Sequence, residues 1–305
     1  MTEESSADRD LVLTLAKGMA LLRAYRPGEM HLSNKEFMER TGFSKPTVSR
    51  LTRTLVELGY LRFSEQHGRY ALGAGVLTLG YPLLVSLSIR QAARPLMREL
   101  AEAVSGQVSM GIRDRFTMTF IESSRSPNHR LTMPEIGGTV PLLQSAMGRA
   151  YLAAMESRQR EELLASYRIH RPSEWDRYAS ELPAALADYE HRGFTCSFGE
   201  VRPEAYACAV PLRLRWDDEI ISVNCGIAAH LVGRDELIDT IGPKLVWTAR
   251  SIEAAAGFWM PAQPAIEHEL SRIPQKTRPI KRSGPARRAD VISKRPPKTK
   301  KKGRT

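Results

Sequence analysis

The sequence has little cysteine and no clustered metal ligands. Its 305 residues include three cysteines, Cys196, Cys208 and Cys225, and no two of them form a C-x-x-C pair. The seven histidines form no H-x-x-x-H pair and no cluster with cysteine. These absences predict neither a disulfide framework nor a metal site. Isolated thiols are typical of reduced, buried cysteines in a cytosolic protein, so we expect a cytoplasmic location.

The sequence also lacks the local motifs of common catalytic sites. It contains no G-x-S-x-G, no G-x-x-x-x-G-K-[ST] and no H-E-x-x-H. Gly73 and Gly75 follow a predicted strand, but the next glycine is Gly80, which misses the dinucleotide-binding spacing. The acidic residues 217–219 fall in a predicted turn, where they are solvated. We therefore expect no catalytic residues, no cofactor and no enzymatic activity.

Acidic residues are nearly absent from the C-terminal segment, although the whole chain is basic. Residues 271–305 contain 14 of the 45 Lys and Arg residues and one acidic residue, Asp290. Residues 1–270 then carry 31 basic and 33 acidic residues, so the net charge of +11 belongs to the tail. Such a segment, rich in Pro and Lys, is predicted to be disordered from 263 to 305.

Long uninterrupted apolar runs are also missing. The acidic N-terminus MTEESSADRD predicts no secretory signal. Residues 71–89 carry no charge, but they include three glycines, Pro82, Thr78 and two serines. A membrane span needs about 20 predominantly apolar residues. We therefore expect no membrane association and interpret this stretch as a helix packed against protein.

Hydrophobic periodicity predicts a small helical module followed by a larger mixed domain. Helices are expected over 11–25, 34–40 and 44–58, and a hairpin over 60–63 and 69–72. Helices over 74–87 and 88–104 follow. The remainder predicts strands near 108–112, 116–120, 194–199, 206–215 and 219–228, with helices near 145–155, 157–167, 180–192 and 235–258. The expected domains are 1–73, a linker helix over 74–89, an α+β domain over 90–262 and the tail.

The third helix has one apolar and one cationic side. On a helical wheel, Val48, Leu51, Leu55 and Leu58 share one face. Its polar N-terminal half follows a tight turn from a short helix, which is the geometry that presents a helix to the DNA major groove. We expect Arg50 to bind guanine bidentately. The remaining candidate DNA contacts are the phosphate-binding Ser44, Lys45, Thr47, Ser49 and Arg53, and the hairpin residues His67 and Arg69.

These segments carry a family resemblance. The runs LAKGMALLRAY, LSNKEFMERTGFSKPTVSRLTRTLVELGYL, and GRYALG followed by LTLG resemble the IclR family of bacterial transcription regulators. QSAMGRAYLAAM, ACAVPLRL and ISVNCG resemble its effector-binding domain. The resemblance covers roughly residues 11–260. It implies a winged helix-turn-helix, a linker helix used in dimerisation, and a GAF-like α+β domain. It also implies homodimers or tetramers on palindromic promoter DNA, controlled by small effectors that are often carboxylate or aromatic compounds.

The resemblance further implies the lining of an effector pocket. By position it maps onto Thr132, Val140, Ala146, Met147, Ser197, Ala207 and Val223 to Cys225, and Ser145 is a further candidate for a polar contact. Relatives that bind small acids through an Asp and a Cys have those residues where this chain has Ser197 and Ala207. The strand that often ends in Ser-Gly-Pro here reads Asn224-Cys225-Gly226-Ile227. These differences favour a more apolar ligand, with Asn224, Ser197 and Ser145 as its polar anchors.

Two other hypotheses remain open from sequence. An architectural DNA-binding protein would depend on the basic tail, because Lys and Arg release counterions from DNA without reading its sequence. An enzyme within residues 90–260 would convert the molecule that it binds. A defined DNA site separates the first alternative from a regulator, and chemical conversion of a bound ligand identifies the second.

Overall fold

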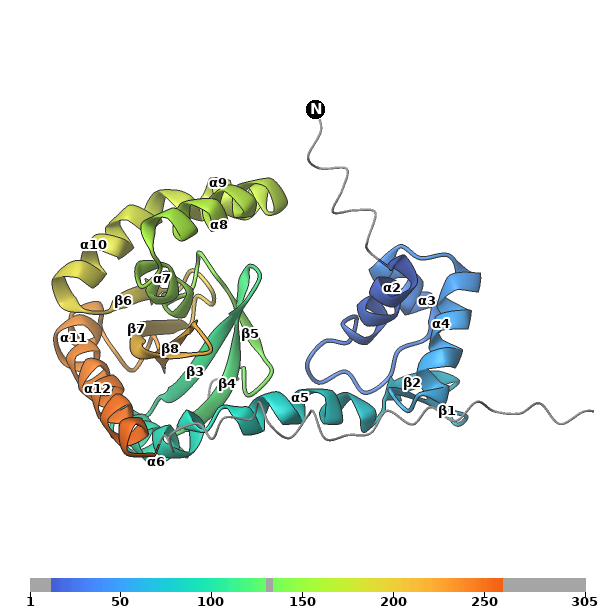
Figure 1. Cartoon of the computed structure of the whole chain (residues 1–305), viewed down its shortest axis with the longest axis horizontal. Coiled ribbons are helices and arrows are strands. Elements are labelled where there is room, and N and C mark those ends of the chain that lie inside the picture. Colours follow the sequence, from blue (N-terminus) through green and yellow to red (C-terminus); the bar gives the residue numbers. More distant parts are fainter. Residues whose placement is uncertain (1–11, 130–133, 260–305) are drawn as a thin grey trace, which may run out of the picture. The chain divides into compact units, whose positions relative to one another are not determined.

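The computed structural model describes residues 12–129 and 134–259, and its N-terminal part is a winged helix-turn-helix (Figure 1). Here three helices precede a two-stranded antiparallel hairpin, as the sequence predicts. The elements are α2 (Leu13–Leu22), α3 (Asn34–Thr41), α4 (Lys45–Glu57), β1 (Leu61–Ser64) and β2 (Arg69–Leu72).

A compact apolar cluster joins these elements. Its buried members are Leu21, Leu32, Phe37, Val48, Leu51, Leu55 and Leu61. Leu58 was expected on this face but is 61% exposed, because it caps the end of α4 before Gly59 turns the chain at φ 76°. Helix α2 buries Leu21 and leaves Met19 exposed. The apolar residues of α2 occur on all sides of the helix, so their spacing does not identify one inner face.

Two helices connect the winged domain to the sheet domain. No residue of α5 (Gly75–Ser86) is buried, whereas α6 (Ile89–Ala103) buries Ala93, Met97, Leu100 and Ala101. Among the described residues, no single helix is long and apolar enough to cross a membrane. In the part of the chain that the structure describes, one helix pair, α5 with α6, passes that test of length and composition, and the two helices are bent by 88° at their junction.

The C-terminal part is an α+β domain built on a six-stranded antiparallel sheet, which confirms the expected fold class. The strand order is β5-β4-β3-β8-β7-β6. The strands are β3 (Gln107–Asp114), β4 (Thr117–Arg125), β5 (Thr139–Pro141), β6 (Thr195–Phe198), β7 (Ala205–Trp216) and β8 (Glu219–Ala228). The helices are α7 (Ala146–Ala153), α8 (Ser157–His170), α9 (Pro172–Tyr178), α10 (Leu182–Arg192), α11 (Arg234–Glu236) and α12 (Gly242–Trp259), with a short 3-10 turn at Ala179–Glu181.

Helices cover both faces of the sheet, and strand alternation decides which side chain meets which helix (Figure 1). Helices α6 and α12 pack on one face over Val108, Met110, Val210 and Val223. Helix α7, backed by α10, packs on the opposite face over a second apolar cluster that includes Met118, Phe120, Val140, Ala209 and Ile220. We call this second side the α7 face.

The last helix, predicted as one uninterrupted element over 235–258, is interrupted in the structure. A π-helical segment, Leu237–Ile241, separates α11 from α12. Pro243, at the start of α12, has no N–H to donate to the preceding turn, which accounts for the altered hydrogen bonding there. Strand β5 and helix α9 were not expected from sequence, because each is too short to show a period.

Candidate nucleic-acid interface and ligand cavity

A tight turn positions α4 after α3. Ser33 and Glu36 form a capping box at the start of α3, with Ser33 N donating to Glu36 Oε2 at 2.8 Å and Glu36 N donating to Ser33 Oγ at 3.3 Å. Gly42 ends α3 in the left-handed region, at φ 70°, which suits glycine. Ser44 then begins α4 in an extended conformation. This local geometry fixes the angle at which α4 leaves the turn.

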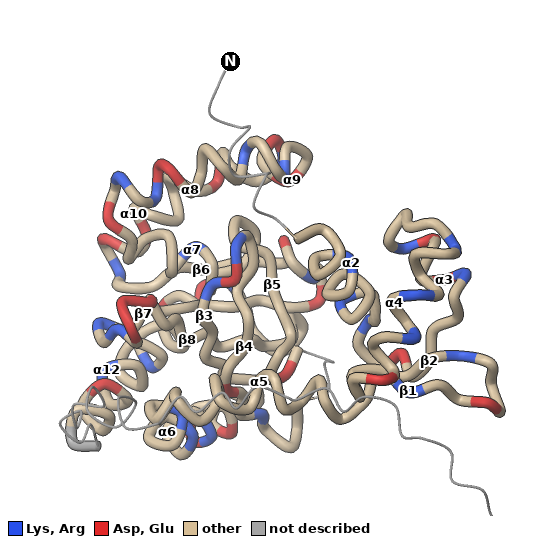
Figure 2. The backbone as a smooth tube through the Cα atoms, turned by 45° about the vertical axis from the view of Figure 1, so that its right-hand side comes forward, with Lys and Arg blue, Asp and Glu red and all other residues tan. Residues whose placement is uncertain are grey.

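Helix α4 carries several Lys and Arg residues, which are blue in Figure 2. Val48, Leu51 and Leu55 are at most 7% exposed, so they fix the orientation of the helix. Lys45, Arg50 and Arg53 are exposed on the other side, and none has an ion-pair partner within the described residues. Ser44 and Ser49 are also exposed, and Thr47 is partly buried. Six predicted DNA-contacting residues therefore lie on or beside one outward surface.

The start of α4 leaves backbone donors available. Ser44 Oγ makes no capping hydrogen bond to the helix and instead contacts Thr47 Oγ1 at 3.0 Å. The N–H groups of the first helical turn have no acceptors within the helix. An anion such as a DNA phosphate satisfies such donors and is favoured by the helix dipole.

The hairpin places its two predicted contact residues differently. His67 is exposed at the turn, where its Nδ1 lies 2.9 Å from Ser64 Oγ and its ring stacks on His31 with centroids 4.7 Å apart. Arg69 begins β2 and pairs with Glu36 of α3 at 3.2 Å. Its guanidinium therefore fastens the hairpin to α3. Arg62, an exposed arginine on β1, was not among the predicted contacts.

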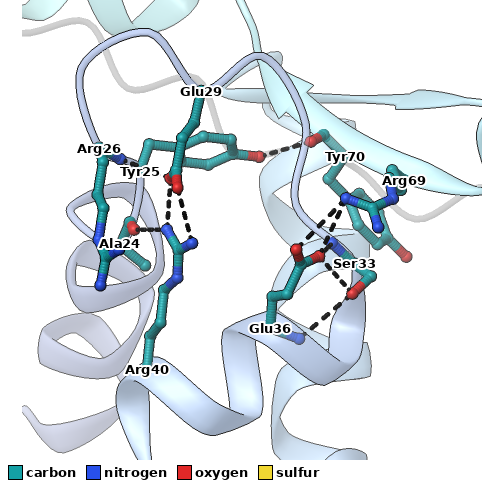
Figure 3. Close-up of polar contacts among 9 residues, drawn as sticks. All are labelled: Ala24, Tyr25, Arg26, Glu29, Ser33, Glu36, Arg40, Arg69 and Tyr70. Carbon is teal, nitrogen blue, oxygen red and sulfur yellow. Dashed lines mark hydrogen bonds and ion pairs between the residues drawn. The ribbon is translucent and has the colours of Figure 1, made fainter.

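Polar contacts hold the segments around α3 together (Figure 3). Arg40 donates to the carbonyl of Ala24 at 2.8 Å and pairs with both carboxylate oxygens of Glu29. Tyr25 Oη donates to the carbonyl of Tyr70 at 2.9 Å. These bonds tie the chain after α2 to α3 and to the hairpin, so they support the position of α4 indirectly.

A cavity of about 40 Å³ lies on the α7 face of the sheet. It brings together seven of the ten predicted effector-binding residues: Val140, Ser145, Ala146, Met147, Ser197, Ala207 and Asn224. Five lining residues were missed by the sequence analysis: Phe120, Pro134, Val201, Arg202 and Ala205. Residues 201 and 202 lie in an irregular loop that has no periodic signal. Thr132 lies outside the described residues.

Cys225 does not belong to this cavity. Cys225 of β8 lies opposite Cys208 in the antiparallel register with β7, and both are free thiols. Cys225 lies in the core between the sheet and helices α6 and α12. Successive residues of a strand point to opposite faces. Asn224 therefore cannot line one cavity together with its neighbours Val223 and Cys225, and the expectation for both of these residues was wrong.

The cavity combines apolar walls with a few polar groups. Asn224 is 7% exposed, and its Oδ1 has no hydrogen-bond partner among the described residues. Arg202 contributes the cationic side chain of the lining. Ser145 Oγ donates its proton to Pro141 O at 2.6 Å and accepts from Gly148 N at 3.0 Å. Ser145 thus caps α7 and has no proton left for a ligand, and the other polar residues of the lining are Asn224, Ser197 and Arg202.

Comparison with known proteins identifies the family. The model of the bacterial transcriptional regulator IclR C-terminal domain matches residues 82–254, and the IclR helix-turn-helix model matches residues 14–65. The chain belongs to the IclR family. Its similarity to an IclR-family transcriptional regulator structure from Brucella abortus spans 84% of this chain and 96% of that one, with 38% identity and a TM-score of 0.70.

Curated relatives of this IclR-family chain are transcriptional regulators. The HTH-type transcriptional regulator TsaQ1/TsaQ2 of Comamonas testosteroni is 36% identical over 61% of this chain and 68% of its own length. The Pca regulon regulatory protein of Pseudomonas putida is 25% identical over 81% of this chain and 85% of its own length. This chain is therefore an IclR-type transcriptional regulator with a helix-turn-helix DNA-binding domain.

The three thiols of this IclR-family chain are expected to be chemically inert in the folded state. Burial raises the pKa of Cys196 and Cys225 to about 12, and raises that of Cys208 well above its usual value. Because the thiolate is the nucleophile, only about one thiol in 10⁴ is ionised at pH 8 for such a pKa. Iodoacetamide at pH 8 should modify all three in urea and none of them natively within an hour, as read by mass spectrometry. Rapid native labelling of any one would contradict this burial.

The Arg40–Glu29 pair should make the stability of the IclR-type winged domain depend on acid pH. The Arg40 guanidinium and the backbone N–H of Arg26 lower the pKa of Glu29 from 4.5 to about 2. This stabilisation is present above pH 4.5 and is lost as the pH falls towards 2. In calorimetry of the full chain, Arg40→Met should lower the melting temperature of this domain at pH 6, and the difference from wild type should shrink at pH 2–3. A difference independent of pH would show that the carboxylate is not responsible.

Proposed function

We propose that this IclR-family regulator binds promoter DNA through α4 and the hairpin, and that a small molecule in the α7-face cavity controls this binding. The observation that carries the DNA interface is the unpaired cationic surface of α4, held outward by a buried apolar side. Arg50 reads a guanine, while Lys45, Arg53 and the hydroxyls of Ser44, Thr47 and Ser49 bind phosphate. His67 and Arg62 contact the DNA backbone beside the groove.

The chain acts as a homo-oligomer in this proposal. Helix α5 exposes Leu77, Leu79, Tyr81, Leu83 and Val85 at 41–78% and buries none of its residues. An uncharged helix of this kind is stabilised by packing against a second copy of itself. A dimer places two α4 helices in successive major grooves, about 34 Å apart. Binding to promoter DNA places the work of the protein in the bacterial cytoplasm.

The effector is a small molecule with an apolar or aromatic body and one or two polar groups. Phe120, Val140 and Met147 supply apolar walls, and Asn224 and Arg202 supply polar ends suited to a hydroxyl and a carboxylate. An IclR homolog from Microbacterium hydrocarbonoxydans, 19% identical with a TM-score of 0.62, was solved in complex with 4-hydroxybenzoate. That compound is a reasonable first probe for this cavity.

In vitro selection of duplexes by the full chain, followed by footprinting, tests the proposal. The selected sequence should be a palindrome whose half-site centres lie about one helical turn apart. Adding an effector should change the protein concentration at which the footprint appears, and the boundaries of the protected DNA should stay the same. Failure to enrich any sequence would contradict the regulator and would favour non-specific binding by the basic tail.

A further inference from the structure

The α7-face cavity is too small for the ligand that it is proposed to bind. Its volume is about 40 Å³, whereas a cavity that admits benzene measures roughly 150 Å³. A wall must therefore move before a ring-sized molecule enters. Most of the lining belongs to strands of the sheet or to α7, whose backbone hydrogen bonds resist displacement.

Two described parts of the wall are irregular: Pro134, and the loop that connects β6 to β7. Residues 199–204, which we call the cavity loop, connect β6 to β7 and contribute Val201 and Arg202 to the lining. Val201 and Arg202 lie outside helices and strands, and among the described lining residues this is otherwise true only of Pro134 and of Ser145, the N-cap of α7. At its far end the loop is fixed by a backbone bond in which Ala229 N donates to Glu204 O at 2.9 Å.

The side chain of Glu200 fastens the near end of the loop. Glu200 Oε1 accepts from Arg149 Nη1 at 3.0 Å, and Glu200 Oε2 accepts from the backbone N–H of Phe198. Gly199 precedes it at φ 104°, a conformation that glycine adopts readily and that turns Glu200 back towards α7. The Glu200 side chain is 18% exposed, so water can reach it and compete for its bonds.

Arg149 stays bonded when Glu200 leaves. Its side chain is 5% exposed and also donates to Leu143 O at 2.9 Å, to Cys196 O at 3.0 Å and to Glu181 Oε2 at 2.5 Å. Releasing Glu200 therefore leaves no unpaired buried cation, which would otherwise be costly. Arg149 is a fixed anchor on α7, and Glu200 is the movable partner.

We propose that Glu200 is a positioning residue for the effector site: it latches the cavity loop to Arg149, and its release opens the cavity to the ligand. This inference rests on the proposed effector function of the cavity. Because the latch holds the closed state, it limits how fast a ligand enters and leaves. The latch also joins the loop to α7, whose Ala146 and Met147 line the cavity, so ligand binding and loop closure act on the same helix.

Hydrogen exchange of the full chain tests the latch without any ligand. Glu200→Gln keeps the side-chain volume but weakens the bonds to Arg149 and Phe198. The amides of residues 198–202 and 204 should exchange about tenfold faster than in wild type, with strands β7 and β8 unchanged. Glu181→Gln is the matched control, since it removes the other carboxylate on Arg149 but lies outside the loop, and it should change loop exchange less than twofold. Equal exchange in wild type and Glu200→Gln, or equal acceleration in both variants, would overturn the latch.

Ligand kinetics supply a readout that a purely structural role would not move. In stopped-flow binding of 4-hydroxybenzoate, Glu200→Gln should raise both the association and the dissociation rate constants about tenfold. Damage to the site alone would raise dissociation and leave association unchanged, which would contradict the latch. If 4-hydroxybenzoate binds neither protein, the proposed ligand class is wrong, and the exchange experiment still decides the latch.

Discussion

Replacing Arg50 with alanine is expected to weaken specific DNA binding by about 30-fold to 2 × 10⁴-fold. A bidentate Arg–guanine contact contributes about 1–3 kcal/mol of discrimination, and a dimer carries two of them, so the expected loss is about 2–6 kcal/mol. Arg50 is exposed and has no ion-pair partner among the described residues, so the fold should not change. Binding to the selected duplex, measured by fluorescence anisotropy at fixed salt, gives the result.

A charge-matched control separates readout from simple electrostatics. Arg158→Ala removes the same charge from α8, where the side chain is 84% exposed, and should change affinity less than twofold. Binding of Arg50→Ala to an unselected duplex should fall far less than binding to the selected one. Equal losses on both duplexes would show that Arg50 binds phosphate and does not read a base.

Replacing Gly148 with alanine is expected to destabilise the effector domain by about 3 kcal/mol or more. A Cβ at this position would lie 2.0 Å from the carbonyl oxygen of Leu142 and 2.7 Å from its Cα. Both atoms belong to the backbone, so a side-chain rotation cannot relieve the clash. The start of α7 must move, and with it the cavity wall formed by Ala146 and Met147. Urea unfolding followed by tryptophan fluorescence measures the effect.

Gly257 provides the matched substitution. It lies in α12, and an added Cβ would meet no atom within 4 Å among the described residues. Gly257→Ala should leave stability unchanged or raise it by up to about 1 kcal/mol, because alanine favours helix. A Gly148→Ala protein as stable as Gly257→Ala would mean that α7 does not approach Leu142 this closely.

The winged domain could be predicted well because its signals are local. Ser33 and Glu36 stand at capping-box spacing, Gly42 stands at the turn, and Val48, Leu51 and Leu55 repeat at helical spacing. The predictions for two residues of this domain were incomplete for physical reasons. Leu58 lies beyond the last helical turn, and the pairing of Arg69 with Glu36 joins residues 33 positions apart, which no local pattern encodes.

The cavity could be predicted only in part. The family resemblance correctly placed α7 and Asn224 at the cavity. Cys225 follows Asn224 on the same strand, so its side chain points to the opposite face of the sheet and cannot line the cavity. Arg202 and Val201 enter the wall through the irregular cavity loop, whose path depends on the bonds of Glu200 to Arg149 and Phe198. Such long-range contacts have no periodic signature in the sequence.

Directed cleavage of DNA from α4 tests most directly whether this helix lies in the major groove. Because the native thiols are buried, a Ser49→Cys protein should accept an iron–EDTA reagent at that one position. On the selected duplex, cleavage should fall in two clusters about one helical turn apart, and Arg158→Cys on α8 should give none. Diffuse cleavage from Ser49→Cys, or the same pattern from both proteins, would contradict DNA recognition by α4.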